Sequence, residues 1–215
     1  MGARNRSTRV YLFRHGATDL SLPPPRMVGR LDPPLNSLGV EQAEAAARRA
    51  ERLKAVAVFA SPLKRSLMTA RVIARRLGVA LEVVSDLSEI NYGEWEGRLV
   101  SELERDPRFL AFRMDPEGNP PPGGEGVKEV AERVRRAIFE ITRRARGPTV
   151  VVGHRTANRL LLCRALGAPL SRYRQIGQDL CCLNVLEVGE EEIFAITIND
   201  TCHLKEVGRK CPSTG

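Results

Sequence analysis

The sequence has few aromatic residues and no long apolar run. Aromatic side chains make up 5% of the 215 residues, so the stacking platforms that bind single-stranded nucleic acid are scarce. No apolar stretch approaches the ~20 residues that a membrane-spanning helix needs. The basic residues 1–6 are not followed by the long apolar segment of a secretory signal. We therefore expect a cytoplasmic protein with neither a membrane partner nor a nucleic-acid partner.

Lysine is also scarce, although the chain is strongly basic. The formal net charge is +8 and the pI is about 9.7, yet lysine occurs only at positions 54, 64, 128, 205 and 210. The many arginines are spread along the predicted helices and alternate with glutamate, rather than forming one basic patch. Solvated arginine faces explain this pattern better than nucleic-acid binding does, and their positive field favours small anions.

The cysteines do not form a disulfide framework. There are five, at positions 163, 181, 182, 202 and 211, and an odd number gathered late in the chain does not pair up. A metal site made of Cys181, Cys182, Cys202 and His203 lacks the usual CxxC spacing. We expect reduced, buried thiols and no metal.

Length and periodicity favour one α/β domain over residues 1–215, with residues 1–8 and 208–215 as flexible tails. Short apolar runs predict strands at 10–13, 56–59, 81–84, 149–152, 182–188 and 193–198. Helices are predicted at 36–54, 61–78, 98–114 with a break at Pro107, 127–146 and 157–166. Because strands alternate with helices, we expect a mainly parallel sheet between two layers of helices, a three-layer α/β/α sandwich.

Two of the three histidines follow predicted strands directly. The first strand runs into Arg14-His15-Gly16, and the strand at 149–152 ends at Gly153-His154. The second strand ends beside Ser61-Pro62, which opens the helix that carries Arg65. Since the carboxyl ends of parallel strands share one edge, we expect Arg14, His15, Arg65 and His154 to meet there as an anion site. Glu89, in the irregular segment 87–97, is predicted to lie over the same edge.

These segments, in this order, resemble the histidine phosphatase superfamily, whose fold is that of phosphoglycerate mutase. The resemblance rests on Arg14-His15-Gly16, on Arg65 within SPLKRSLMTA, on Glu89 within LSEINYGEWEG and on His154. It implies that His15 is a nucleophile forming a phosphohistidine without a metal or other cofactor. It also implies that Arg14, Arg65 and His154 bind the phosphate oxygens and that Glu89 serves as acid and base.

The chain departs from the family pattern at three places. Many relatives have glutamate directly after Arg-His-Gly and asparagine six residues beyond the histidine, where this chain has Ala17 and Ser21. Glycine often follows the second histidine, where this chain has Arg155. We predict that Ser21 and Arg155 also bind substrate. The departures concern the choice of substrate more than the reaction.

The substrate stays open at this stage. Phosphoglycerate mutases carry Arg-His-Tyr after the acid, whereas this chain has Ile90-Asn91-Tyr92, which favours hydrolysis. The segments 177–179 and 198–204 resemble metal-independent phosphoserine phosphatases, so phosphoserine or a similar small phosphorylated metabolite is expected. His203 then lies near the substrate, at a homodimer contact, or simply caps the last strand. The alternatives are a phosphoglycerate mutase, an α-ribazole or sugar phosphate phosphatase, and a non-catalytic phosphate-binding regulatory module.

Overall fold

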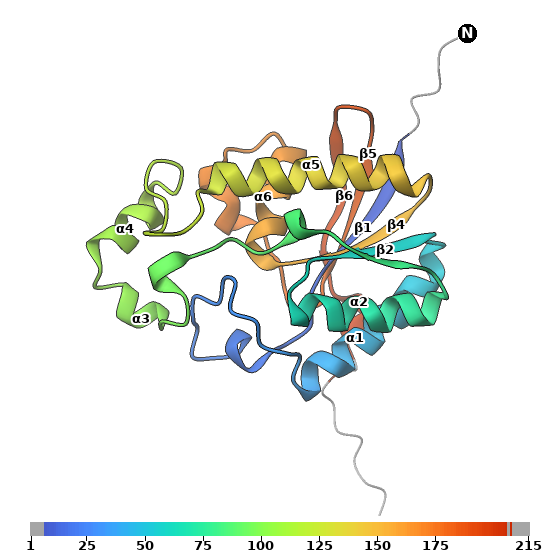
Figure 1. Ribbon diagram of the computed structural model, residues 1–215, viewed down its shortest axis with the longest axis horizontal. Coiled ribbons are helices and arrows are strands. Elements are labelled where there is room, and N and C mark those ends of the chain that lie inside the picture. Colours follow the sequence, from blue (N-terminus) through green and yellow to red (C-terminus); the bar gives the residue numbers. More distant parts are fainter. Residues whose placement is uncertain (1–6, 206, 208–215) are drawn as a thin grey trace, which may run out of the picture.

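The computed structural model of this chain describes residues 7–205 and 207, and its centre is a six-stranded sheet (Figure 1). The strands stand in the order β3-β2-β4-β1-β5-β6. Their bounds are β1 Thr8–Arg14, β2 Ala57–Ala60, β3 Leu81–Val83, β4 Thr149–Gly153, β5 Leu183–Val188 and β6 Ile193–Asp200. The pairs β3–β2, β2–β4 and β4–β1 are parallel, whereas β5 runs antiparallel to both β1 and β6. The mainly parallel sheet is confirmed.

Helices cover both faces of this sheet, as expected (Figure 1). Alternate residues of β1 face opposite ways: Val10 and Leu12 belong to one apolar cluster, Tyr11 and Phe13 to the other. The first cluster includes residues of α5 (Val127–Ala145) and α6 (Arg155–Ala165), and the second includes residues of α1 (Ser37–Ala50) and α2 (Lys64–Leu77). The three-layer sandwich is confirmed.

Two predicted helix ends are confirmed in detail. The side chain of Asn36 accepts a hydrogen bond from the Gly39 backbone N–H at the start of α1. Gly78 ends α2 with a positive φ of 65°, a backbone conformation that glycine adopts without strain.

The segment predicted as one helix over 98–114 is two short helices, α3 (Val100–Leu103) and α4 (Pro107–Met114). The predicted break at Pro107 is confirmed, because Asp106 caps α4 with its side chain and proline occupies the first helical position. Aromatic side chains hold this part together: the Trp95 ring lies 5.3 Å from that of Phe109 and 5.4 Å from that of Phe112.

Three predicted boundaries were wrong. Helix α2 begins at Lys64, not at 61, because the Ser61 hydroxyl accepts the Leu63 N–H in an extended turn. Helix α6 begins at Arg155, directly after His154, rather than at 157. Thr8 pairs with Val188 as the first residue of β1 and is not part of a tail. The other residues of the predicted tails, apart from Ser7, lie outside the described residues.

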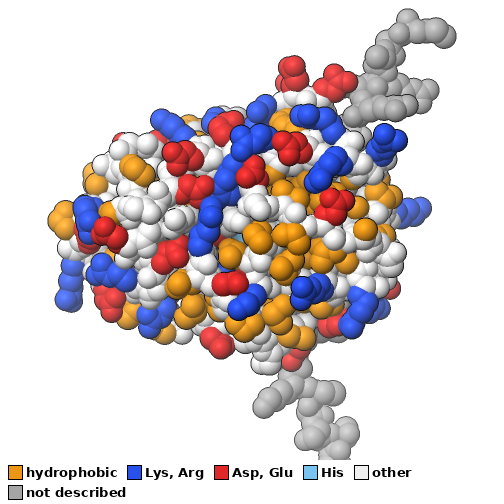
Figure 2. All heavy atoms as spheres, in the orientation of Figure 1, with side chains coloured by type: hydrophobic (Ala, Val, Ile, Leu, Met, Phe, Trp, Pro, Cys, Tyr) orange, Lys and Arg blue, Asp and Glu red, His pale blue; other side chains and the backbone are white. Residues whose placement is uncertain are grey.

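Charges of both signs alternate on the surface seen in Figure 2, where Lys and Arg side chains stand among Asp and Glu. Exposed ion pairs of this kind include Arg164 with Glu132 on α5 and Arg136 with Asp86. Such pairs each contribute at most ~1 kcal/mol. Among the described residues, no helix combines the length and the apolar character that crossing a membrane requires.

Candidate active site

The carboxyl ends of β1, β2 and β4 bring the predicted site residues together. Six of the seven line one cleft, whose volume is about 60 Å³: they are Arg14, His15, Ser21, Arg65, Glu89 and Arg155. The seventh, His154, does not line the cleft, but its ring centroid lies 5.2 Å from that of His15. The Arg14, His15, Arg65, Glu89 and His154 side chains are all buried. The sheet edge that the sequence predicted is therefore the edge where these groups meet.

The hydrogen bonds of His15 determine which ring nitrogen is free. Nδ1 lies 2.7 Å from the carbonyl oxygen of Gly16, and a carbonyl only accepts, so Nδ1 carries the proton. Nε2 therefore has a lone pair and accepts a hydrogen bond of 3.2 Å from Arg65 Nε. Burial first, and then Arg65 and Arg14, lower the pKa of His15 well below its ordinary value. The ring is neutral, and Nε2 is its unprotonated nitrogen.

His154 presents the opposite arrangement. Its Nε2 lies 2.7 Å from the Ser61 hydroxyl, which already accepts the Leu63 N–H. If Ser61 donates its proton to Nε2, the proton of the neutral ring is on Nδ1, and Nδ1 is buried without a partner. Burial, followed by the charge of Arg65, lowers the pKa of His154 well below its ordinary value. An unpartnered buried N–H is costly, and a bound anion would satisfy it.

The two arginines are fixed by backbone carbonyls rather than by carboxylates. Arg65 donates from Nη1 to Leu31 O at 2.6 Å and from Nη2 to Gly29 O at 2.8 Å. Arg14 donates from Nη1 to Gln178 O at 2.6 Å, while its Nε is buried without a partner. Burial, with Arg155 as the next cause, lowers the pKa of Arg14 to about 9. Both guanidinium groups therefore keep their positive charge uncompensated by a bound carboxylate.

Glu89 is held by the first turn of α6. Oε1 accepts the backbone N–H groups of Ile90 and Ala157, and Oε2 accepts that of Thr156, all at 3.0 Å. The helix N-terminus stabilises the carboxylate there. Oε2 has only this one hydrogen bond and keeps a further lone pair. The carboxyl group is thus buried, oriented and still able to exchange a proton with a group in the cleft.

The loop after His15 packs very closely on α1. A Cβ on Gly16 would lie 2.5 Å from the Gly39 carbonyl oxygen, so a larger residue does not fit without movement of the backbone. The Gly16 N–H donates to Thr69 Oγ1 and the Ala17 N–H to Gln42 Oε1. Helices α1 and α2 therefore fix the position of His15 through this loop.

The two additional substrate-binding predictions have different outcomes. Ser21 lines the cleft, but its hydroxyl donates to Thr18 O and accepts the Thr18 N–H, both at 2.8 Å. Its proton is already used in closing the turn, which does not favour a role in binding phosphate. Arg155 is exposed, lines the cleft and makes no hydrogen bond or ion pair with any other described residue. It is free to meet a substrate.

Sequence reasoning missed several polar residues around the site. Tyr92 and Thr156 line the cleft and share a hydrogen bond of 2.9 Å between their hydroxyl groups. Behind Arg14, Gln178 and Asn184 are joined by hydrogen bonds of 2.6 Å and 3.1 Å, and Asn158 donates to Gln178 at 3.2 Å. Asn184 stands in β5 among apolar residues, and this polar interruption of a strand was the available signal.

Neither the described cysteines nor His203 lines the cleft, although the backbones of Cys181 and Cys182 bond to those of His15 and Arg14. Cys163, Cys181 and Cys182 are buried free thiols and Cys202 is exposed, while Cys211 is outside the described residues. Burial raises the pKa of Cys182 to about 11, so it stays protonated. Among the described residues, no three His, Cys, Asp or Glu side chains are grouped to hold a metal ion. His203 lies 3.0 Å from Cys181 O through Nε2, which ties the end of the chain to the segment behind Arg14.

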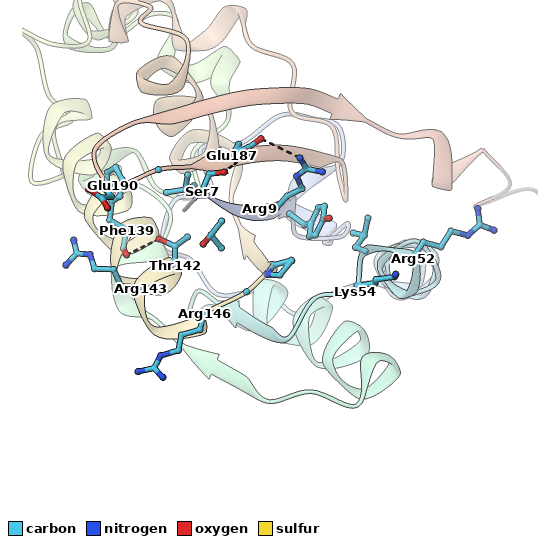
Figure 3. Close-up of a pocket in the computed structure, with 17 residues that line it drawn as sticks. Ser7, Arg9, Arg52, Lys54, Phe139, Thr142, Arg143, Arg146, Glu187 and Glu190 are labelled. Carbon is cyan, nitrogen blue, oxygen red and sulfur yellow. Dashed lines mark hydrogen bonds and ion pairs between the residues drawn. The ribbon is translucent and has the colours of Figure 1, made fainter. Parts of the chain in front are cut away.

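A larger hollow lies elsewhere in the described part of the chain. It measures about 1380 Å³ and lies at the opposite edge of the sheet, where β1 and β4 begin (Figure 3). Arg52, Arg143 and Arg146 at its border point away from its centre in Figure 3. Arg143 belongs to the last turn of α5, where a cation complements the helix dipole. Its lining includes no histidine or cysteine, and we assign it no chemistry.

Comparisons with known proteins agree with this geometry. The family model of the histidine phosphatase superfamily (branch 1) matches residues 10–201. A protein of Mycobacterium tuberculosis named as bifunctional is 40% identical over 207 residues, which cover 94% of this chain and 57% of that protein. The chain thus spans little more than half the length of that relative.

Two further matches cover both partners almost completely. Phosphoserine phosphatase 1 of Hydrogenobacter thermophilus is 34% identical over 203 residues, 92% of this chain and 95% of that protein. The solved structure of YhfR from Bacillus stearothermophilus has a TM-score of 0.85 at 27% identity, covering 92% of this chain and 100% of that one. With its Arg-His-Gly strand end, its second histidine and its buried acid meeting at one sheet edge, this chain belongs to the histidine phosphatase superfamily.

Proposed function

We propose that this chain is a phosphatase that hydrolyses phosphate monoesters through a phosphohistidine on His15, with no metal ion or other cofactor. The observation that carries the proposal is the unprotonated Nε2 of His15, which lies beside Arg65 while Nδ1 donates to Gly16 O. A nucleophile with a free lone pair next to buried, uncompensated cations is suited to attack a phosphate dianion.

In the first step, His15 Nε2 forms a bond to phosphorus as the bond from phosphorus to the ester oxygen breaks. Arg14 Nε and His154 Nδ1, both buried without partners, donate to the phosphoryl oxygens. Arg65 Nε moves its hydrogen bond from His15 to the same group. Glu89, protonated before this step, gives its proton to the leaving alkoxide through Oε2.

In the second step, Glu89 acts as the base. It takes a proton from a water molecule, whose oxygen bonds to phosphorus while the Nε2–phosphorus bond breaks. Inorganic phosphate leaves, His15 regains its lone pair and Glu89 is protonated again. The same residue therefore serves both halves of the cycle, as the single buried carboxylate of the cleft lining.

For the substrate, we favour phosphoserine or a similarly small phosphorylated metabolite. The cleft of about 60 Å³ is far below the ~300–1,000 Å³ of pockets for drug-sized ligands. The relative named phosphoserine phosphatase 1 matches nearly end to end. Cytoplasmic location and a homodimer remain predictions; sedimentation at several protein concentrations tests the second.

The test is a phosphatase screen with EDTA present throughout. The panel is phosphoserine, phosphoglycerates, sugar phosphates, nucleotides and p-nitrophenyl phosphate, with release of inorganic phosphate as the readout. We expect hydrolysis of a small monoester that EDTA does not reduce. Isomerised phosphoglycerate without phosphate release would instead identify a mutase. Stoichiometric binding with no turnover of any ester would identify a regulatory module.

A further inference from the structure

A second cavity of about 210 Å³ adjoins the catalytic cleft. Tyr92, Arg155 and Thr156 line both, so the two spaces are neighbours across these residues. Tyr92 and Thr156 are buried and bonded to each other through their hydroxyl groups. An ester whose phosphate lies at His15 can therefore extend its alcohol part past this pair into the second cavity.

The lining of this second cavity combines cationic and aromatic side chains. Its cations are Arg113, Arg155, Arg159 and Arg174, its aromatic residues are Tyr92, Phe109, Phe112 and Tyr173, and no carboxylate lines it. Arg174 is stacked, with its guanidinium carbon 4.8 Å from the Phe112 ring centre, and Arg113 pairs with Glu104 at 3.1 Å. Two of the four arginines are thus already engaged.

Arg155 and Arg159 have no acidic partner. Arg155 opens α6 and makes no hydrogen bond or ion pair with any described residue, although the dipole of a helix disfavours a cation at its first turn. Arg159 is half-buried and donates from Nε to Ile176 O at 2.7 Å, and no described residue contacts its Nη atoms by a hydrogen bond. Burial, and next the charge of Arg155, lower the pKa of Arg159. The charge of Glu89 acts on Arg159 in the opposite direction but more weakly, and no hydrogen bond or ion pair joins these two residues.

The spacing of Arg155 and Arg159 along α6 allows both to contact one anionic group of a ligand. Residues four apart on a helix are neighbours, with ~5–6 Å between Cβ atoms, so the two guanidinium groups can share an anion. By contrast, Arg133 and Arg164 have acidic partners, Glu125 and Glu132, each at 2.7 Å.

We infer that Arg155 and Arg159 bind a second anionic group of the substrate, a carboxylate or a second phosphoryl group on the alcohol part of the ester. This inference rests on the proposed phosphatase function and specifies its substrate class. The residues Ile90 and Asn91 replace the Arg-His pair of the phosphoglycerate mutases, and the sequence alone suggested that such an anchor is weakened. Helix α6 supplies the anchor from a different element.

The test compares matched ligands on the His15→Ala protein, which binds without turnover. Glycerol 3-phosphate differs from 3-phosphoglycerate only in having a hydroxymethyl group in place of the carboxylate. Fructose 6-phosphate and fructose 1,6-bisphosphate make the same comparison for a second phosphoryl group. We expect calorimetry to show at least ~10-fold tighter binding of the more anionic ligand in one of the two pairs. The pair that shows this preference tells whether the second anionic group is a carboxylate or a phosphoryl group.

Variants then show which residues cause the preference for the more anionic ligand. Arg155→Gln and Arg159→Gln should each remove most of it, whereas Arg52→Gln, at the opposite edge of the sheet, should keep it. Equal affinity within both pairs, no binding of any of the four ligands, or a preference that survives both arginine changes would overturn the inference. Hydrolysis of p-nitrophenyl phosphate by the wild-type protein tests the proposed function separately, because that ester carries no second anion.

Discussion

The side chain of His15 is held at both ring nitrogens by neighbours that fix its protonation. Gly16 O takes the Nδ1 proton and Arg65 Nε faces Nε2. A proton on Nε2 would place two donors against each other in a buried site that already holds Arg14. The geometry therefore keeps the His15 ring neutral at pH values where an exposed histidine is charged.

This neutrality has a consequence for stability. The pKa values of His15 and His154 are well below 6.5 in the folded chain, chiefly because both rings are buried. Between those values and 6.5, the unfolded chain binds protons that the folded chain does not, so stability falls as pH falls. Each histidine contributes ~1.4 kcal/mol per pH unit in that window.

We therefore expect the free energy of unfolding of the wild type to fall more than that of His154→Gln as the pH is lowered from 6.5 to 5.0. Urea unfolding of both proteins at the two pH values measures this difference. The contribution of the carboxylates cancels in the comparison, because both proteins have the same carboxylates. Equal losses for the two proteins would mean that folding does not lower the pKa of His154.

A second prediction concerns the proton that Glu89 gives to the leaving group. A natural alkoxide leaving group needs a proton, whereas p-nitrophenolate leaves without much help. Glu89→Gln should lower the phosphorylation rate with phosphoserine or a sugar phosphate by ~10²-fold or more relative to the p-nitrophenyl ester. Single-turnover bursts isolate this step, since Glu89 also serves dephosphorylation.

The matched control is Glu94→Gln, because Glu94 is exposed in the same segment and pairs with Arg108. Glu94→Gln should leave the phosphorylation rate unchanged with both esters. Equal losses for the two esters in Glu89→Gln would show that another group is the acid.

At the scale of elements, β5 and the segment before it support Arg14 from behind. Asn184 in β5 donates to Leu12 O at 3.0 Å and accepts from Gln178 Nε2 at 2.6 Å. The carbonyl of Gln178 in turn accepts from Arg14 Nη1. This network makes Asn184 a positioning residue, since it acts on the site only through Gln178 and Arg14.

Asn184→Leu should lower the free energy of unfolding by ~1–3 kcal/mol, because Gln178 loses buried partners. It should also weaken competitive inhibition by vanadate, by roughly tenfold, as Arg14 loses its fixed position. Thr149→Val is the control, since the Thr149 hydroxyl is buried without a partner in β4, on the other side of β1. A destabilised Asn184→Leu protein with unchanged vanadate inhibition would show that Arg14 is held without this network.

The sequence predicted where the strands end, but not which backbone carbonyls and amide side chains hold the site residues in place. The apolar runs before Arg14 and His154 predicted parallel strands, and parallel strands bring their carboxyl ends together whatever the details of packing. The carbonyls of Gly29 and Leu31 that hold Arg65 carry no side-chain signal. They depend on how the proline-rich loop folds back on α2, which no local pattern shows. The role of Asn184 likewise depends on a partner six residues away in an irregular segment.

The positions expected from the resemblance agree best with the structure where the proposed chemistry fixes the residue type. Both histidines, both arginines and Glu89 meet around the cleft. Ser21, placed by its distance from His15 in the sequence, instead closes a local turn. The short polar side chain satisfies its own backbone first, a competition that residue spacing does not reveal.

At the scale of the whole molecule, two basic cavities lie at opposite edges of one sheet. The smaller one is lined by the buried cations Arg14 and Arg65, and Arg14 Nε has no partner there, whereas Arg52, Arg143 and Arg146 at the border of the larger one point away from its centre (Figure 3). Vanadate or phosphate at ~100 times its Kd should add ~2.7 kcal/mol of stability, which raises Tm by roughly 5–10 °C for a chain of this size.

Thermal scans of two variants assign that shift to one cavity. Arg65→Gln should lose it and Arg146→Gln should keep it. The reverse result would place the anion site at the amino ends of the strands and contradict the site described above.

The measurement that tests the central claim most directly is rapid quenching of wild-type protein during turnover of a phosphate-labelled substrate. The account predicts acid-labile phosphate on the chain, approaching about one group per active site when dephosphorylation is slow. Mass spectrometry of the peptide that contains residues 10–18 should place it on His15, and His15→Ala should show neither label nor hydrolysis. Continued hydrolysis by His15→Ala, or rapid wild-type turnover with no label on His15 at any quench time, would contradict it.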